Sequence, residues 1–177
     1  GFFDSDWVEH LREQVDADMV KPSPMRKNVD EKKGEKGFFF DTFISHHMEG
    51  FDKAVRESPG AEIAGQLMGS NKINLLFDQL LIKDPGATTR TVWHHDATYW
   101  PVAGDQICTL WLALDPVTHD TGAVEYIKGS HLSGQRYLAV SFNPDEKYKE
   151  DLPEVPDIEA NRKDYNIVWF DLEPGDC

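Results

Sequence analysis

Several features are missing from this sequence. No apolar run approaches the roughly 20 residues of a transmembrane helix, and residues 1–20 carry Asp and Glu throughout, without the apolar core of a signal peptide. Cysteine is scarce: Cys108 and Cys177 form neither a CxxC motif nor a disulfide framework. Cys108 lies in an apolar run, so we expect a buried free thiol there. These absences favour a reducing, cytoplasmic setting.

Positive charge is also in short supply. The 18 Lys and Arg residues face 32 Asp and Glu, which gives a formal net charge of −14. Nucleic acids and anionic membranes need a basic footprint, so neither is an expected partner. A local basic pocket for an anionic substrate remains compatible with this balance. With 177 residues, 40% of them hydrophobic, the chain is expected to form one globular domain spanning 1–177.

The first part of the chain has helical patterns. Residues 4–19 combine a capping Asp4 or Ser5 with an apolar stripe that includes Leu11 and Val15. Shorter helices are predicted at 41–56 and 59–69, after an exposed loop at 21–37.

Strand patterns dominate the rest, and they lie at 73–83, 91–96, 107–114, 122–127 and 166–172. Residues 129–165 are polar and indicate a long surface excursion, and a turn at 173–176 follows the last strand. Helices followed by short strands predict an α+β protein with a sandwich or barrel core. A doubly wound parallel sheet is not expected, because helices and strands do not alternate.

The segment Trp93–Trp100 carries the chemistry. On a strand, residues two apart point to the same face, so His94 and Asp96 would project together while His95 packs or hydrogen-bonds behind them. A His and a carboxylate from one strand are two of the ligands of a 2-His-1-carboxylate iron site, which keeps three coordination positions open. His-x-Asp alone is short enough to arise by chance, and a polar strand end is the alternative.

The motifs around this segment resemble the phytanoyl-CoA dioxygenase family of iron(II)/2-oxoglutarate oxygenases. The matching pieces, in order, are Gln79–Gly86, Trp93–Asp96, Leu110–Asp115, Thr121–Val124 and Lys128–His131. The resemblance implies a double-stranded β-helix (jelly-roll, cupin-like) core with N-terminal helices packed on one side. It implies Fe(II) as cofactor, and 2-oxoglutarate and O2 as co-substrates. Related halogenases have a small residue at the position of Asp96, so its carboxylate favours hydroxylation.

The resemblance also implies residues that follow the Gly175-Asp176 turn. The family's distal His, the third iron ligand, and a basic residue for 2-oxoglutarate lie after this turn. We therefore expect the third ligand, and the last strands of the core, beyond Cys177 in a longer chain. A truncated, inactive protein is the alternative.

Further pocket residues are predicted around the ligand pair. Trp111, which shares a strand face with Thr109, matches a family position near 2-oxoglutarate, and Gln79 and Lys83 share a face of the 73–83 strand that points to the same pocket. Tyr99 and Trp100 are predicted on the substrate side. The alternative roles are core packing for the aromatic residues and an exposed strand end for Gln79 and Lys83.

The resemblance therefore implies a hydroxylase that acts on a small or medium organic molecule and releases succinate and CO2, and we expect a monomer or homodimer. Two other functions stay open: a non-catalytic or truncated binding protein on the same scaffold, and a cupin-type metalloenzyme that does not use 2-oxoglutarate. The fold does not choose the substrate.

Overall fold

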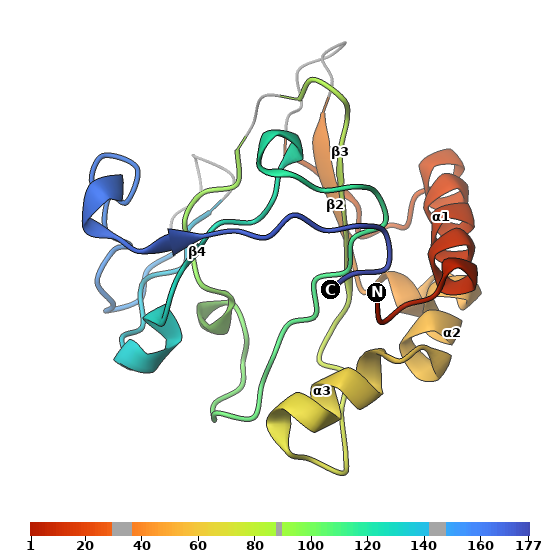
Figure 1. The fold of residues 1–177 in the computed structure, drawn as a ribbon, viewed down its shortest axis with the longest axis horizontal. Coiled ribbons are helices and arrows are strands. Elements are labelled where there is room, and N and C mark those ends of the chain that lie inside the picture. Colours follow the sequence, from red (N-terminus) through yellow and green to blue (C-terminus); the bar gives the residue numbers. More distant parts are fainter. Residues whose placement is uncertain (30–36, 88–89, 142–147) are drawn as a thin grey trace.

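The first two α-helices and the smaller sheet lie on opposite sides of the molecule (Figure 1). The computed structural model describes residues 1–29, 37–87, 90–141 and 148–177, and the predicted loop 21–37 and excursion 129–165 fall partly outside them. The described residues form three α-helices and two small antiparallel sheets, which confirms a mixture of helix and sheet. The helices are α1 (Ser5–Val20), α2 (Glu49–Glu57) and α3 (Gly60–Met68). No helix among the described residues is both long and apolar enough to cross a bilayer.

Helix α1 forms where its sequence pattern predicts it. The Asp4 carboxylate accepts a hydrogen bond from the backbone N–H of Trp7 at 3.0 Å, which caps the first turn. Val8 and Leu11 are buried on one face. The helix ends at Val20, before Lys21 and Pro22, because proline disfavours helical backbone in the residue before it.

The larger sheet has the order β1-β2-β3, and all its neighbours are antiparallel. The strands are β1 (Lys27–Asn28), β2 (Phe38–Thr42) and β3 (Gln79–Lys83). The helix predicted at 41–56 was wrong at its start, because residues 41–42 belong to β2, which pairs along its whole length with β3. The chain then forms a 3-10 turn at Ile44–His46 before α2 begins at Glu49.

The core joins the helices to this sheet. Leu11 of α1, Phe51 and Ala54 of α2, Ile44 and Leu80 form one buried cluster. Leu112 and Leu114 pack against it, and the Arg12 guanidinium donates to the Leu114 carbonyl at 2.6 and 3.0 Å. Residues 107–114 are thereby attached to α1, although no strand forms there.

A buried charge cluster fastens the chain after α1. Asp18 and Asp41 are both 0% exposed, and the Arg26 guanidinium forms an ion pair with the Asp18 carboxylate. Ser23 donates to Asp41 from both its hydroxyl and its backbone N–H. The Arg26 guanidinium also lies 4.3 Å from the centre of the Phe39 ring. Buried carboxylates need such partners, so this cluster fixes the path of the chain between α1 and β1.

The strands that form in the rest of the chain cover fewer residues than the sequence patterns predict. The smaller sheet pairs β4 (Tyr126–Ile127) with β5 (Ile167–Val168), and one further bridge joins Val117 to Leu172. Within 73–83 only β3 is a strand, because Asp78 accepts hydrogen bonds from the Ser45 N–H and hydroxyl and fixes the chain just before it. Short 3-10 turns occur at Asp96–Thr98, His119–Thr121, Ser130–Ser133 and Arg162–Asp164.

Two local details differ from what the sequence indicates. Cys108 is exposed, so the prediction of a buried thiol was wrong. Most of the described side chains in 129–165 are exposed, but Ala139 and Ile158 are buried and belong to the interior.

Phe43 has an unusual backbone for a bulky residue. Its φ of 55° lies in the left-handed region, which is costly for a residue with a Cβ atom. Its ring contacts the rings of His46 and Phe77, with centroids 5.8 and 5.9 Å apart. The strain is therefore retained where an aromatic cluster holds the side chain.

Candidate metal centre

His94 and Asp96 lie side by side. The His94 Nε2 atom is 3.3 Å from the Asp96 Oδ1 atom. The predicted strand at 91–96 does not form, since a 3-10 turn begins at Asp96. The alternation survives locally because His95 between them is extended, with φ −131° and ψ 140°. One extended residue is enough to bring the two side chains together.

A second hydrogen bond determines which nitrogen of His94 faces Asp96. The Nδ1 atom lies 2.7 Å from the Val92 carbonyl oxygen, which can only accept, so Nδ1 carries the proton and donates. Nε2 is then the atom turned toward the carboxylate. The bond to Asp96 raises the pKa of His94 against the opposing effect of burial. The same bond lowers the pKa of Asp96, and a bond from Thr109 adds to that effect.

This donor pair fits a transition metal such as Fe(II). An imidazole nitrogen and a carboxylate oxygen are suitable ligands, and a second ring nitrogen held by a carbonyl is the usual support for a ligating His. Two donors bound cis at about 2.1 Å would lie about 3.0 Å apart, close to the 3.3 Å between Nε2 and Oδ1. Among the described residues, no three His, Cys, Asp or Glu side chains group closely enough to hold a metal. The third ligand beyond Cys177 stays a prediction.

Two side chains of the motif hold the segment 137–140. The His95 Nε2 atom accepts a hydrogen bond from the Tyr137 N–H at 2.9 Å. The Tyr99 hydroxyl donates to the Val140 carbonyl at 2.7 Å and accepts from the Val140 N–H at 3.0 Å. Burial raises the pKa of Tyr99, which keeps the donating proton in place. These anchors connect motif and segment, and neither stretch is a strand.

A chain of polar contacts reaches the motif from the other sheet. The Trp93 indole N–H donates to Glu159 at 2.8 Å, and Arg162 bonds to both Glu159 and Glu125. His119 donates to Glu125 at 3.2 Å. The residue before His94 is thus connected to β4 through charged side chains.

The remaining predicted site residues have different surroundings. The Tyr99 ring meets the His94 ring edge-on, with centroids 5.8 Å apart. Trp100 lies edge-on to Phe77 at 6.3 Å, and Trp111 is half-buried. Gln79 and Lys83 stand at the two ends of β3, and the Lys83 ammonium lies 4.9 Å from the Phe38 ring centre. Only Tyr99 among these five has a described contact with the ligand pair.

Sequence reasoning missed the partners of the motif. Thr109 donates its hydroxyl proton to Asp96 Oδ2 at 3.0 Å. The backbone N–H groups of Tyr137 and Val140 donate to the side chains of His95 and Tyr99. The alternation that places Thr109 on the same strand face as Trp111 was a sequence signal that could have indicated the contact of Thr109 with Asp96. Backbone partners leave no signal, since any residue supplies the same atoms.

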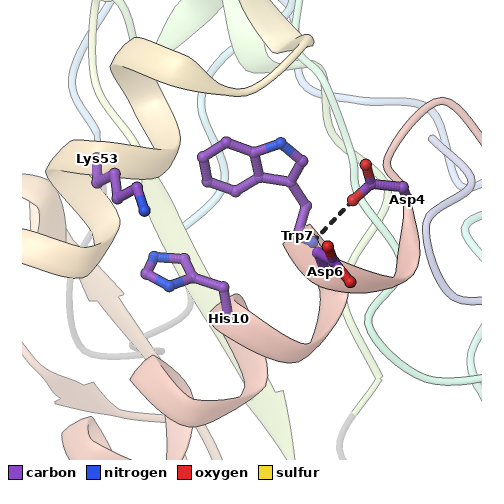
Figure 2. A pocket seen from close by; sticks show the side chains of 5 residues that line it. All are labelled: Asp4, Asp6, Trp7, His10 and Lys53. Carbon is purple, nitrogen blue, oxygen red and sulfur yellow. Dashed lines mark hydrogen bonds between the residues drawn. The ribbon is translucent and has the colours of Figure 1, made fainter.

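A small hollow lies elsewhere, between α1 and α2 (Figure 2). Its volume is about 230 Å³, and it is lined by Asp4, Asp6, Trp7, His10 and Lys53. The ring N–H of His10 donates to the Gly50 carbonyl at 2.9 Å, and the Trp7 and His10 rings meet edge-on. None of the predicted site residues lines it, and these contacts serve to pack the two helices.

The comparisons with known proteins agree with the motif. The family model for phytanoyl-CoA dioxygenase (PhyH) matches residues 1–177. The chain therefore belongs to the phytanoyl-CoA dioxygenase family, whose members are in general iron(II)- and 2-oxoglutarate-dependent oxygenases. No curated protein and no solved structure gives a significant match.

Proposed function

We propose that the protein is an Fe(II)- and 2-oxoglutarate-dependent dioxygenase. It hydroxylates a C–H bond of a small or medium organic substrate and releases succinate and CO2. The observation that carries this proposal is the pairing of His94 Nε2 with Asp96 Oδ1 at 3.3 Å. Family membership supports the cofactor and co-substrate, and the carboxylate of Asp96 favours hydroxylation over halogenation.

His94 and Asp96 hold the iron in this proposal. His94 binds through Nε2, since Nδ1 donates to Val92, and Asp96 supplies the anionic oxygen. Fe(II), when bound, supplies the oxygen activation that is coupled to decarboxylation of 2-oxoglutarate. In the family pattern, a distal His that follows the Gly175-Asp176 turn completes the triad, and the single domain has a double-stranded β-helix core.

Five side chains are assigned to the pocket. Trp111, Gln79 and Lys83 contribute to the 2-oxoglutarate side. Tyr99 and Trp100 contribute to the substrate side. Tyr99 is the best supported, because its ring borders His94 at a centroid distance of 5.8 Å.

Uncoupled turnover tests the proposal without a known substrate. Full-length protein supplied with Fe(II), 2-oxoglutarate and O2 should form succinate slowly, and omission of any one of the three should stop it. Asp96→Ala should reduce succinate formation about 100-fold, while Asp120→Ala, an exposed acid in the turn before β4, serves as the matched control. Equal turnover by Asp96→Ala and the wild type would refute the ligand assignment.

The same assay separates the two rival functions. Fe(II) binding without any succinate formation, with or without candidate substrates, would favour a binding protein on this scaffold. Metal-dependent activity that is indifferent to 2-oxoglutarate would favour a cupin-type enzyme. Succinate formed in proportion to O2 consumed supports the dioxygenase.

A further inference from the structure

We infer that Thr109 is a positioning residue that selects which oxygen of Asp96 faces the metal. This inference rests on the proposed function. The Thr109 hydroxyl donates to Asp96 Oδ2 at 3.0 Å, while Oδ1 is the oxygen 3.3 Å from His94 Nε2. The two oxygens of one carboxylate therefore have separate partners, and the one left for the metal is Oδ1.

Asp96 needs such a partner because its surroundings do not fix it. Its side chain is 44% exposed, so packing leaves the carboxylate room to rotate. A carboxylate can bind a metal through one oxygen or through both. A donor on Oδ2 disfavours rotation and disfavours binding through both oxygens. The expected result is single-oxygen binding, which keeps a coordination position open for 2-oxoglutarate or O2.

The two proposed ligands are held in the same manner. In His94, the nitrogen that does not face Asp96 donates to the Val92 carbonyl, and in Asp96, the oxygen that does not face His94 accepts from Thr109. The His94 support comes from the backbone of its own segment. The Asp96 support is a side chain on a separate segment, and it alone can be removed by a conservative substitution.

Thr109 is suited to this role by the segment that carries it. Ala113, four residues further on, is 1% exposed, and the Leu114 carbonyl accepts two hydrogen bonds from Arg12 of α1. Thr109 therefore joins the exposed carboxylate to a segment that is attached to the core. A threonine hydroxyl is also stiff, because branching at Cβ restricts its χ1 angle.

The test compares Thr109→Val with Thr109→Ser in full-length protein. Valine has nearly the shape of threonine but cannot donate, whereas serine keeps the donor on a freer χ1. Thr109→Val should weaken anaerobic Fe(II) binding about 10-fold, within the range of changes to groups that support metal ligands. Thr109→Ser should stay within about 3-fold of the wild type. Thr91→Val, an exposed threonine on the motif segment, is the matched control.

A spectroscopic readout distinguishes positioning from a general structural effect. Co(II) substituted for Fe(II) should give a changed visible absorption spectrum in Thr109→Val, because Asp96 becomes free to bind through both oxygens. The spectrum of Thr109→Ser should match the wild type. The unfolding midpoint of the metal-free protein should be the same for all three.

The outcomes separate this inference from the proposed function. If Asp96→Ala abolishes Fe(II) binding while Thr109→Val binds like the wild type with an unchanged Co(II) spectrum, the role of Thr109 is refuted and the proposed function stands. If Asp96→Ala binds Fe(II) as tightly as the wild type, the ligand assignment fails and the inference fails with it. Weaker binding by Thr109→Val, with recovery in Thr109→Ser and a normal midpoint, supports it.

Discussion

The Glu125 carboxylate accepts two hydrogen bonds from the Arg162 guanidinium, at 2.6 and 3.0 Å. This pair joins the residue before β4 to the turn that precedes β5, and through Glu159 it reaches Trp93, which precedes His94. The bond from Arg162 lowers the pKa of Glu125 to about 2, with a smaller contribution from His119. The ion pair of Glu125 with Arg162 therefore weakens when Glu125 is protonated in acid.

Acid should weaken the protein through this pair. A carboxyl whose folded pKa lies below its unfolded value contributes stability above the unfolded value, here 4.5, and loses it as pH falls toward 2. Arg162 is 37% exposed, so solvent screening keeps the contribution of this pair to stability at neutral pH small. Thermal unfolding between pH 2 and pH 7 should show a smaller acid loss for Glu125→Gln than for the wild type. Identical pH profiles would contradict the assignment.

Removing Arg26 should be costly. Arg26→Met leaves the carboxylates of Asp18 and Asp41 buried without their cation, and such a loss costs about 3 kcal/mol or more. Urea unfolding measures the change. Lys27→Met alters a neighbouring exposed cation and should stay within about 0.5 kcal/mol. A variant at Arg26 as stable as the control would show that the cluster does not hold the chain.

The two histidines of the motif should respond differently to the same change. His94→Gln should lose Fe(II) binding at least about 10-fold, since it removes a proposed ligand. His95→Gln should bind Fe(II) nearly as the wild type does, because the amide oxygen of glutamine can still accept from the Tyr137 N–H. Calorimetric titration under anaerobic conditions measures both. Loss in His95→Gln with retention in His94→Gln would reverse the assignment.

Phe43 allows a test of backbone strain. Phe43→Gly and Phe43→Ala both lose the ring contacts with His46 and Phe77. Only glycine escapes the penalty of a Cβ atom at a φ of 55°. We therefore expect the glycine variant to be about 1 kcal/mol more stable than the alanine variant in denaturant unfolding. The usual order, with alanine more stable, would show that the left-handed backbone is not retained.

Local signals predicted the first helix well. Asp4, one of the two capping candidates, and the apolar stripe that includes Leu11 lie within one short stretch, so the start and the buried face of α1 could be inferred from the sequence alone. The His94–Asp96 pair was predictable for a similar reason, because it depends on the backbone of one intervening residue. The family was also recognisable, from motifs whose order is preserved between Gln79 and His131.

Long-range pairing was less predictable. Strand β2 forms because Phe38–Thr42 pairs with Gln79–Lys83. The residues around Phe38 carry no local pattern that indicates a pairing partner about 40 residues later in the sequence. The strand expected at 73–83 lost its first half to the contact of Asp78 with Ser45, a side-chain competition that periodicity cannot detect. No strand forms at 107–114, and this segment is instead attached to α1 by the hydrogen bonds from Arg12 to the Leu114 carbonyl. In each case a contact from a distant segment decided the outcome.

The anchors formed by His95 and Tyr99 make two backbone amides sensitive to the state of the motif. The amide hydrogens of Tyr137 and Val140 bond to an imidazole and to a phenol, in place of the carbonyl acceptors of a β-ladder. Their hydrogen-exchange rates therefore depend on whether the His95 and Tyr99 side chains keep these hydrogen bonds. A metal, co-substrate or substrate that moves either ring would change the exchange of an amide it never contacts. These two amides would therefore report whether the proposed site is occupied.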